Sequence, residues 1–515
     1  MTRAVGDIGA GLAAARAPRL IPAGERLHVV GAAGAGASAA ALLAHHAGAV
    51  VSGCDRGGSS PYSAALAAAG IPLAWEHSAD HLPGVDRLAV TKALTSIQPD
   101  HPELSAARRR GVPLEAWQQV VADAALTAGQ RLVAVAGTHG KSTSSGWLLH
   151  VLVHAGRDPS AFVGALLTAA LTGGAPGTSR WGSGDAFVVE ADEYAGNFDA
   201  YRPAVSVILN AEWDHPDVFA DEAAVLDAFE GWLRTADRAA ADEGEGHLLV
   251  ANVGDPGVAR LVARLADGLD ATRLVCVSLA DPQGPVPEAA TIIGQVSHSE
   301  SQGLNLTTLD VDGLDGWPGP VPLRLGGRHN AANALCVAAA ARSLGVPAAA
   351  IAEGIASFHG VGRRLELKGE PGGVTVLDDY GHHPTAIAAT LAAVRERYPG
   401  RRVWAVYEPL TFHRTAQMLD AFASVLATAD RAVIADVWAG RDPDTTITSA
   451  DALARAISAQ GGPPATAPGS VERTADHVAE RVRAGDVVLV MGGGRSYVIA
   501  ERLVSVLGEL SGAAR

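Results

Sequence analysis

The 515-residue chain is 48% hydrophobic and 18% charged, so it can form two or three packed domains and does not have the composition of a disordered protein. Its formal net charge of −15 argues against a general nucleic-acid binder, because Lys and Arg contacts to phosphates supply most of that affinity. No apolar run reaches the ~18 residues of a membrane span, and the N-terminus lacks the apolar core of a signal peptide. We therefore expect a cytoplasmic protein with neither a membrane nor a nucleic-acid partner.

Cysteine and lysine are both rare in this chain. Cys54, Cys276 and Cys336 form no CxxC pair and have no spacing typical of a metal site, so we expect small buried side chains and no disulfide framework. Lysine occurs only at positions 92, 141 and 368, and every other Lys/Arg position is arginine. Chemistry that requires an ε-amino group is therefore confined to these positions.

Residues 24–128 are predicted to form a first α/β domain, after a flexible N-terminal tail over 1–23. Strands are expected at 27–30, 49–53, 70–73 and 87–91, with an Ala-rich helix at 37–47. The order of strand, glycine loop, helix, strand and acidic residue is typical of the opening of a doubly wound nucleotide-binding sheet.

The glycine loop 31–36 has the spacing GxxGxG, which differs from the dinucleotide fingerprint GxGxxG. A turn that lets the helix pack closely on the sheet would explain these glycines, and so would a ligand that carries a pyrophosphate, NAD being one option. Asp55, at the end of the second strand, suits either a ligand hydroxyl or a backbone contact. The candidate ligand-binding residues of this domain are Gly31, Gly34, Gly36 and Asp55.

A second domain is predicted over 129–358, and it contains the most specific motif. A buried strand at 131–136 runs into Gly137-Thr138-His139-Gly140-Lys141-Ser142-Thr143, and a helix follows to about residue 154. Glycines let backbone N–H groups turn toward phosphate oxygens, the helix N-terminus and Lys141 attract the anion, and the Ser142 hydroxyl suits Mg²⁺. A Walker loop would have glycine at 135, where this chain has valine, so the loop is a shorter variant.

Acidic clusters follow the next two predicted strands, 187–190 and 205–210. They read Glu190-Ala191-Asp192-Glu193 and Asn210-Ala211-Glu212-Trp213-Asp214-His215. Ligands of α/β sheets bind at the carboxyl ends of strands, where carboxylates and an imidazole suit a divalent ion beside phosphates. Residues 281–322 are expected to form a small antiparallel insertion or an edge region of the sheet. Asn330 and Asn333 open a helix that runs to residue 344 and serve as caps or as contacts to a nucleotide base.

A third α/β domain is predicted over 359–515. Its strands are expected at 374–377, 403–407, 431–435 and 487–491. The first of them ends in Asp378-Asp379-Tyr380-Gly381-His382-His383-Pro384, and this density of acidic, imidazole and phenol groups is unusual for an ordinary loop.

Taken in order, GTHGKS, EADE, WDH, HNxxN and DDYGHHP resemble the motifs of the Mur ligases, and most closely those of the branch that adds L-alanine to UDP-N-acetylmuramate. The resemblance extends from about residue 27 to the C-terminus. It implies three α/β domains: a Rossmann-like UDP-binding domain, a central P-loop ATPase with a mainly parallel sheet, and a C-terminal Rossmann-like domain for the amino acid. It also implies formation of an acyl phosphate from ATP, attack by the amine and release of phosphate, in peptidoglycan precursor synthesis.

The resemblance also assigns roles to individual residues. Gly137 to Thr143, Asn330, Asn333, Arg364 and Asp379 would bind ATP, and Lys141 would stabilise the transferring phosphate. Ser142, Glu190 and His215 would hold Mg²⁺ or Mn²⁺. Tyr380, His382 and Arg414 would bind the amino acid, and the UDP-substrate would meet Gly31, Gly34, Gly36 and Asp55. The catalytic set would be Lys141, Glu190, His215, Arg364 and His382. The protein would act as a monomer or homodimer on small-molecule substrates.

The chain departs from that branch near the predicted amino-acid site. The branch usually has Gln-Pro-His where this chain has Glu408-Pro409-Leu410, and a late Gly-Ala-Gly-Asp motif reads Gly492-Gly493-Gly494-Arg495. A Mur-ligase paralogue that joins another amino acid to a related carboxylate is therefore an alternative. A nucleotide-binding regulatory protein is a second, which Lys141, Glu190 and His215 argue against, and an NAD-dependent dehydrogenase would leave the phosphate loop idle.

Overall fold

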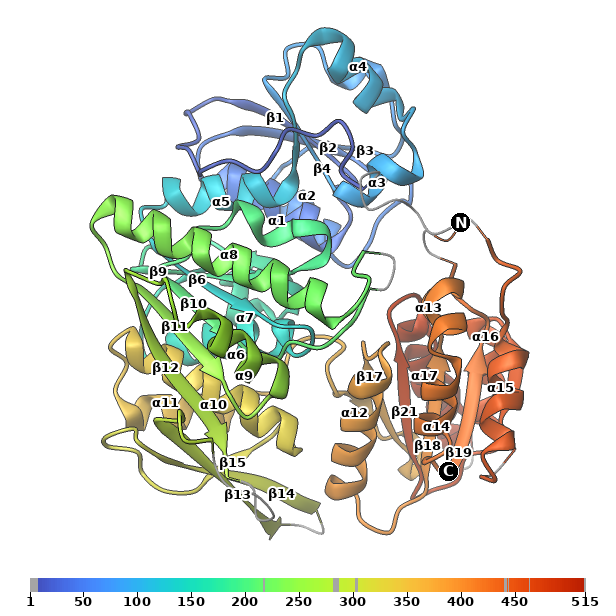
Figure 1. The fold of residues 1–515 in the computed structure, drawn as a ribbon. Helices are drawn as coiled ribbons and strands as arrows, with labels where there is room; N and C mark the ends of the chain where they lie inside the picture. Colours follow the sequence, from blue (N-terminus) through green and yellow to red (C-terminus); the bar gives the residue numbers. More distant parts are fainter. Residues whose placement is uncertain are drawn as a thin grey trace. The chain divides into compact units, whose positions relative to one another are not determined.

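The computed structural model describes residues 8–215, 218–280, 287–301, 304–439, 442, 444–462 and 464–513. The described residues form three sheets with flanking helices, and the predicted three-domain α/β class is confirmed (Figure 1). The chain divides into two compact units. The first contains Met1–Val296, Leu309–Val321 and Ala332–Val361; the second contains Ser297–Thr308, Pro322–Ala331 and Gly362–Arg515. Among the described residues, no helix is long and apolar enough to cross a membrane.

The first sheet is entirely parallel and has the strand order β3-β2-β1-β4-β5. Its strands are β1 (Arg26–Val30), β2 (Val50–Cys54), β3 (Leu73–Ala74), β4 (Arg87–Val90) and β5 (Leu114–Ala116). Its helices are α1 (Ala35–His46), α2 (Ser63–Ala68), η2 (Ala79–His81), α3 (Lys92–Ile97), α4 (Pro102–Arg110) and α5 (Trp117–Thr127). The strand order reverses between β1 and β4, and ligands of doubly wound sheets bind at such a switch point.

The described part of the predicted tail, residues 8–23, packs against the first sheet. The Arg16 guanidinium pairs with Glu115 at 3.1 Å and with Asp123 at 2.8 Å, and Ile21 is buried. Both carboxylates are themselves buried, and buried carboxylates need cationic or hydrogen-bonding partners. Residues 8–23 therefore do not behave as the loose tail predicted from composition, because the acidic residues that hold them lie about a hundred positions away.

The central sheet has the strand order β15-β14-β13-β12-β11-β10-β6-β9-β7-β8. Its strands are β6 (Arg131–Ala136), β7 (Ser160–Leu167), β8 (Gly177–Arg180), β9 (Ala186–Ala191), β10 (Val205–Ile208), β11 (His247–Asn252), β12 (Thr272–Leu279), β13 (Ile292–Ser301), β14 (Leu304–Asp312) and β15 (Val321–Leu323). Its helices are α6 (Lys141–His154), α7 (Ala169–Thr172), η3 (Tyr194–Ala200), α8 (Glu222–Glu243), α9 (Pro256–Leu265), α10 (Arg328–Ser343) and α11 (Ala348–Ser357).

Most pairs in the central sheet are parallel, and β7 with β8 is antiparallel. Of the two predictions for residues 281–322, the edge region agrees with the structure, since β13, β14 and β15 lie at one end of the sheet order and β13 pairs parallel with β12. Residues 281–286 and 302–303 of that segment lie outside the described residues. Strands β6, β9 and β10 are adjacent and parallel, so the loops that follow them meet at one edge.

The third sheet has the order β16-β17-β21-β18-β19-β20, with β16 antiparallel to β17 and the other pairs parallel. Its strands are β16 (Glu366–Gly369), β17 (Thr375–Asp379), β18 (Val403–Glu408), β19 (Arg431–Ala435), β20 (Thr466–Gly469) and β21 (Val487–Gly492). Its helices are η4 (Pro371–Gly373), α12 (Pro384–Arg397), α13 (Phe412–Gln417), α14 (Leu419–Leu426), α15 (Ala450–Ala459), α16 (Val471–Ala479) and α17 (Ser496–Ala513). Alternate residues of β18 enter two separate apolar clusters, which is expected of a strand buried on both faces.

Candidate active site

The loop between β6 and α6 has the geometry of an anion-binding turn. Gly137 and Gly140 have φ values of +146° and +80°, in the region that favours glycine. A Cβ atom on Gly140 would lie 2.9 Å from the Asn333 side-chain nitrogen, so the loop has no room for a larger residue there. Gly140 caps α6 and has no side chain of its own to bond the N–H groups of the first turn, which favours an anion there. Gly140 and Asn333, which were both predicted to bind ATP, thus lie next to each other.

Lys141 folds back over this loop. Its Nζ donates to the carbonyl oxygens of Gly137 at 2.7 Å and Thr138 at 3.2 Å, and it pairs with Glu193 at 2.9 Å. Burial by itself favours the neutral amine, but Glu193 and Asp192 outweigh it and raise the pKa of Lys141 above its ordinary value. The ammonium therefore stays charged, and its loop carbonyl contacts are ones that phosphate oxygens can replace.

Ser142 and Glu190 meet directly. The Ser142 hydroxyl donates to Glu190 Oε1 at 2.9 Å, while the other carboxylate oxygen accepts from the Gly164 backbone N–H at 2.6 Å. A Cβ atom on Gly164 would come within 2.9 Å of this carboxylate. The predicted pair is therefore brought together, with Glu190 held from the neighbouring strand β7.

His215 belongs to a second group of potential ligands. Its imidazole nitrogen and carboxylate oxygens of Asp192 and Glu193 all lie within 4.8 Å of one another. The His215 backbone has φ +55°, and the ring stacks edge-on against Tyr194 at 4.8 Å. Asp192 accepts from Asn197 at 2.9 Å. Asp192 and Glu193 were not among the predicted site residues, although the motif EADE contains both.

The loops after β6 and β10 are joined by reciprocal hydrogen bonds. Asn210 accepts from the His139 backbone N–H at 2.7 Å and donates to the His139 carbonyl at 3.0 Å. Thr138 bonds the backbone of Glu212 in the same two-way manner, with distances of 3.0 and 2.9 Å. Thr143, in the first turn of α6, is buried. These contacts fix the phosphate loop against the loop that carries His215.

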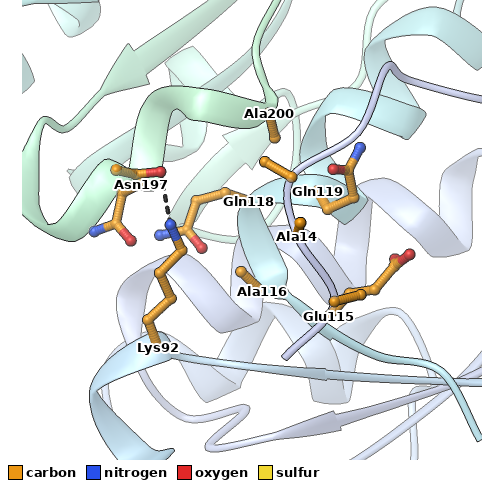
Figure 2. A pocket seen from close by; sticks show the side chains of 11 residues that line it. Ala14, Lys92, Glu115, Ala116, Gln118, Gln119, Asn197 and Ala200 are labelled. Carbon is orange, nitrogen blue, oxygen red and sulfur yellow. Dashed lines mark hydrogen bonds between the residues drawn. The ribbon is translucent and has the colours of Figure 1, made fainter. Parts of the chain in front are cut away.

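Lys92 connects the first sheet to the acidic loop. It begins α3 and donates to the carbonyl oxygens of Ala195 at 2.8 Å and Gly196 at 2.6 Å, and Figure 2 shows it reaching toward this turn. Burial lowers the pKa of Lys92. Lys92 also borders a small pocket, lined by Ala13, Ala14, Ala15, Lys92, Glu115, Ala116, Gln118, Gln119, Gly196, Asn197 and Ala200 (Figure 2). Its rarity as a lysine was the only sequence signal for this position.

The glycine loop of the first sheet is held by Asp55. This carboxylate accepts from the backbone N–H groups of Ala33 at 3.1 Å and Gly57 at 2.7 Å. Asp55 was expected to contact either a ligand hydroxyl or the backbone, and in the structure it contacts the backbone. Gly31 has φ +75°. A Cβ atom on Gly36 would lie 2.3 Å from the Trp117 ring, so Gly36 is required for packing of α1 on α5. Gly34 caps α1 without a side-chain hydrogen bond.

In the second unit, two arginines flank Tyr380. The guanidinium carbons of Arg363 and Arg364 lie 5.1 and 5.0 Å from its ring centroid. Arg363 is structural, since it donates to the Gly492 carbonyl at 2.7 Å and pairs with Asp378 at 3.2 Å. Arg364, the predicted phosphate contact, therefore lies beside the predicted amino-acid residue Tyr380.

Asp379 and His382 are oriented by backbone groups at the end of β17. Asp379 accepts from the N–H groups of Leu365 at 2.9 Å and Gly381 at 2.7 Å. His382 Nδ1 lies 2.9 Å from the Tyr380 carbonyl oxygen, and the two rings are 5.4 Å apart. Asp379 thus shapes the loop that carries both predicted amino-acid residues. In α10, Asn330 donates to the Gly326 carbonyl at 3.0 Å.

Leu410 and Glu408 lie close to the glycines that follow β21. A Cβ atom on Gly493 would lie 2.7 Å from Leu410 Cδ2 and 3.5 Å from the Tyr380 ring. A Cβ atom on Gly494 would lie 2.8 Å from the Glu408 carboxylate. Burial raises the pKa of Glu408 to about 7. The two departures noted in the sequence are therefore neighbours in space, and Arg414 follows them in α13.

Three family models match the chain in succession. They are described as "Mur ligase family, catalytic domain" over residues 26–128, "Mur ligase middle domain" over 135–341 and "Mur ligase, glutamate ligase domain" over 363–494.

Similar proteins align over nearly the whole chain. The UDP-N-acetylmuramate–L-alanine ligase of Frankia casuarinae is 36% identical and covers 94% of this chain and 98% of its own length. The enzyme of that name from Kineococcus radiotolerans is 38% identical, covering 94% and 96%. A solved UDP-N-acetylmuramate–alanine ligase from Thermotoga maritima has a TM-score of 0.74 at 24% identity, covering 94% and 99%. The chain belongs to the Mur ligase family.

Proposed function

We propose that this protein joins L-alanine to the carboxylate of UDP-N-acetylmuramate at the expense of ATP, in the synthesis of peptidoglycan precursors. Near-full-length identity of 36–38% to ligases of that name supports the substrates. The observation that carries the chemistry is the arrangement of the Gly137–Gly140 loop, Lys141 and the Ser142–Glu190 pair at one sheet edge.

ATP would bind with its phosphates at the N-terminus of α6. The N–H groups of the first turn and the charged Lys141 complement anionic oxygens, and the loop is already held in shape by Asn210 and Glu212. Lys141 would exchange its loop carbonyl contacts for phosphate oxygens and stabilise the charge that develops as the phosphoryl group moves. The substrate carboxylate takes up the phosphoryl group, and ADP leaves.

The residues around the loop fit a hard divalent cation. Oxygen donors come from Ser142 and Glu190, and a second set combines Asp192, Glu193 and His215. Mg²⁺ or Mn²⁺ bound there would neutralise phosphate charge and so make the phosphorus more open to attack. Glu190 is oriented for such a role by the Gly164 N–H, since its second oxygen is already occupied.

The amine would be placed by the third sheet. Arg364, Tyr380, His382 and Arg414 are the residues we assign to the amino acid and the reacting phosphate, with Asp379 fixing the loop between them. Once the amine nitrogen attacks the acyl phosphate, the tetrahedral intermediate expels phosphate and an amide remains. Holding the reactants in line is the main physical contribution of these residues.

A second candidate differs only in the amine. Leu410 packs against Gly493 next to Tyr380, so the surroundings of Tyr380 are apolar at this point. A solved murein peptide ligase from Psychrobacter arcticus also shares the fold, with a TM-score of 0.65 and 25% identity, covering 94% of this chain and 99% of its own. A paralogue that accepts a larger amine or peptide is therefore the alternative to test.

The reaction would take place in the cytoplasm, where ATP and nucleotide sugars are found, on small-molecule substrates and with a monomer or homodimer as the working form. Phosphate release by the purified protein tests the proposal. UDP-N-acetylmuramate, ATP and Mg²⁺ are supplied with L-alanine, glycine, L-serine or a peptide, and each substrate is omitted in turn as a control. Release that requires L-alanine together with the UDP-sugar supports the assignment. Release with the peptide but not L-alanine would favour the paralogue.

A further inference from the structure

Four histidines, a cysteine and a glutamate meet in the first domain, away from the residues used above. Glu103, in α4, lies at the centre of this cluster. The others come from β1, β2, the segment between β3 and α4, and the residue before α4: His28, Cys54, His77, His81 and His101. The sequence spacing did not predict a metal site, because these residues are spread over 76 positions and meet only in the fold.

Four of the side chains form a tight group. One potential ligand atom each from His28, Cys54, His81 and Glu103 lie within 4.8 Å of one another. Glu103 Oε1 is 2.6 Å from His81 Nδ1, 3.0 Å from Cys54 Sγ and 3.7 Å from His28 Nε2. Imidazole, thiolate and carboxylate are all ligand types that Zn²⁺ binds, and four of them match the four-coordinate geometry of a structural zinc site.

Burial and hydrogen bonding both point to a ligand. His28 is 2% exposed, and Cys54 and Glu103 are 0% exposed. His28 Nε2 is buried without a hydrogen-bond partner among the described residues. Native proteins rarely leave buried polar atoms unsatisfied, and a bound ion is one recognised way of satisfying them. The unpartnered Nε2 of His28 is the nitrogen that faces the group.

A neighbouring hydroxyl orients His28. Ser52 Oγ lies 2.8 Å from His28 Nδ1, and the two residues are paired across β1 and β2. Metal-bound histidines commonly use their other ring nitrogen in such a bond, which fixes the tautomer and the ring orientation. Ser52 therefore leaves Nε2 of His28 as the ligand atom.

We propose that His28, Cys54, His81 and Glu103 form a structural Zn²⁺ site. On binding, the Cys54 thiol gives up its proton to solvent, and the contacts of Glu103 with His81 and Cys54 are replaced by bonds to the metal. The ion ties β1, β2, η2 and α4 together. It also braces the glycine loop, because the Cys54 carbonyl oxygen accepts from the N–H groups of Gly31 at 2.8 Å and Ala32 at 3.0 Å. The zinc site does not depend on the proposed ligase activity.

The remaining two histidines define the competing arrangement. His77 and His101 lie 3.4 and 3.5 Å from the other carboxylate oxygen, and with Glu103 they form a three-ligand group. His77 Nδ1 is also 3.3 Å from Cys54 Sγ. That group offers fewer ligands than a closed structural site needs, so we assign His77 and His101 to packing around Glu103.

Zinc titration of the full-length protein after chelator treatment tests the site, with bound metal measured by mass spectrometry. Wild type should bind one equivalent of Zn²⁺, and Co²⁺ in its place should give a tetrahedral visible spectrum with a thiolate charge-transfer band. Cys54→Ser should abolish that band and weaken zinc binding at least tenfold. Cys276→Ser, which changes another buried cysteine, is the matched control and should behave as wild type. His101→Asn should also retain zinc.

A milder variant covers the case in which a ligand substitution prevents folding. Ser52→Ala keeps every ligand and should weaken zinc binding by about 10–100-fold, the usual cost of losing the partner of a metal-bound histidine. Absence of zinc binding by folded wild type would overturn the proposal, as would a thiolate band that survives in Cys54→Ser. Loss of binding in His101→Asn together with full binding in His28→Asn would assign the ion to the other group and contradict ours.

Discussion

The central and third sheets have similar architecture, but the side chains at their edges differ in charge and in packing. At the central edge, Lys141, Glu193 and the Ser142–Glu190 pair form a cradle in which opposite charges are matched over short distances. At the edge of the third sheet, burial raises the pKa of Asp378 to about 6 and that of Glu408 to about 7, and close packing of Leu410 on Gly493 sets the shape. Under the proposed function, phosphate chemistry would depend on charge within a few short motifs, whereas amine choice would depend on the shape set by packing of Leu410 on Gly493.

The largest effect is expected from removing the cation of the central edge. Lys141→Ala should lower ligation by about 100-fold or more, because a contact that strengthens in the transition state is worth about 3 kcal/mol. Phosphate release under saturating substrates measures it. Lys368→Ala, which removes a lysine paired with Glu366 on β16, is the matched control and should be near wild type.

Lys141→Ala leaves Glu193 buried without its cation, so circular dichroism must accompany the assay. Lys141→Arg keeps the charge and provides a folded comparison if the alanine variant is unstable. A folded Lys141→Ala protein with more than about a tenth of wild-type turnover would remove Lys141 from the role of phosphate stabiliser.

Substitution of His215 tests metal binding at the central edge separately from the phosphate contact of Lys141. His215→Ala should raise the Mg²⁺ concentration needed for half-maximal rate about tenfold, since a ligand is lost while Lys141 remains. The measurement is a Mg²⁺ titration of phosphate release. His154→Ala changes a partly exposed histidine of α6 and should leave the titration unchanged. An unchanged Mg²⁺ dependence in His215→Ala would mean that His215 is not a metal ligand.

Shape at the third edge predicts relaxed amine selectivity. We expect L-alanine to be accepted with little discrimination against glycine, L-serine and larger residues, and Leu410→His to sharpen the preference for L-alanine by about 1–3 kcal/mol. The ratio of kcat/KM values across the amino-acid panel measures it. Leu410→Ala opens the same space without a polar group and is the control. A wild-type preference for L-alanine beyond about a thousandfold would make Leu410 a neutral replacement.

The smallest effect concerns stability and the buried acid of the third edge. Burial raises the pKa of Glu408 from 4.5 to about 7 in the folded protein, so the folded state holds a proton that the unfolded state releases. The stabilisation from this proton is complete below pH 4.5 and is lost as the pH rises to about 7. Glu408→Gln should therefore gain stability relative to wild type over that interval. Parallel denaturation curves at pH 5 and 8 with no change in the difference would contradict this.

Sequence reasoning succeeded where function lies in contiguous residues. The phosphate loop, the ends of β9 and β10 and four of the six strands of the third sheet were predicted because each combines an apolar run with a turn of distinctive chemistry. The short strands β16 and β20 were not predicted. Ser142 and Glu190 were also expected to lie together, because the resemblance assigns both to one Mg²⁺ ion.

It failed where residues distant in sequence decide the structure. The packing of residues 8–23 depends on Arg16 finding Glu115 and Asp123, and Lys92 reaches carbonyl groups about a hundred positions away. The Pro- and Gly-rich segment 281–322 was expected as an insertion or an edge region; its strands lie at the sheet edge, but the parallel pairing of β13 with β12 was not foreseen. Cys54 has no metal-ligand spacing in the sequence, and its proximity to Glu103 is seen only in the structure. Asp192 and Glu193 belong to a motif that was recognised in the sequence, but neither was assigned a role. Adjacent acidic residues at the end of a strand do not reveal which of them faces Lys141.

The fate of the carboxylate oxygen tests the central claim most directly. If UDP-N-acetylmuramate is labelled with oxygen-18 in its carboxylate and incubated with ATP, Mg²⁺ and L-alanine, an acyl-phosphate ligase must transfer one labelled oxygen to the released phosphate. We predict phosphate that carries the label in proportion to amide formed, as measured by mass spectrometry. Unlabelled phosphate, formed while the amide accumulates, would contradict an acyl phosphate as the intermediate.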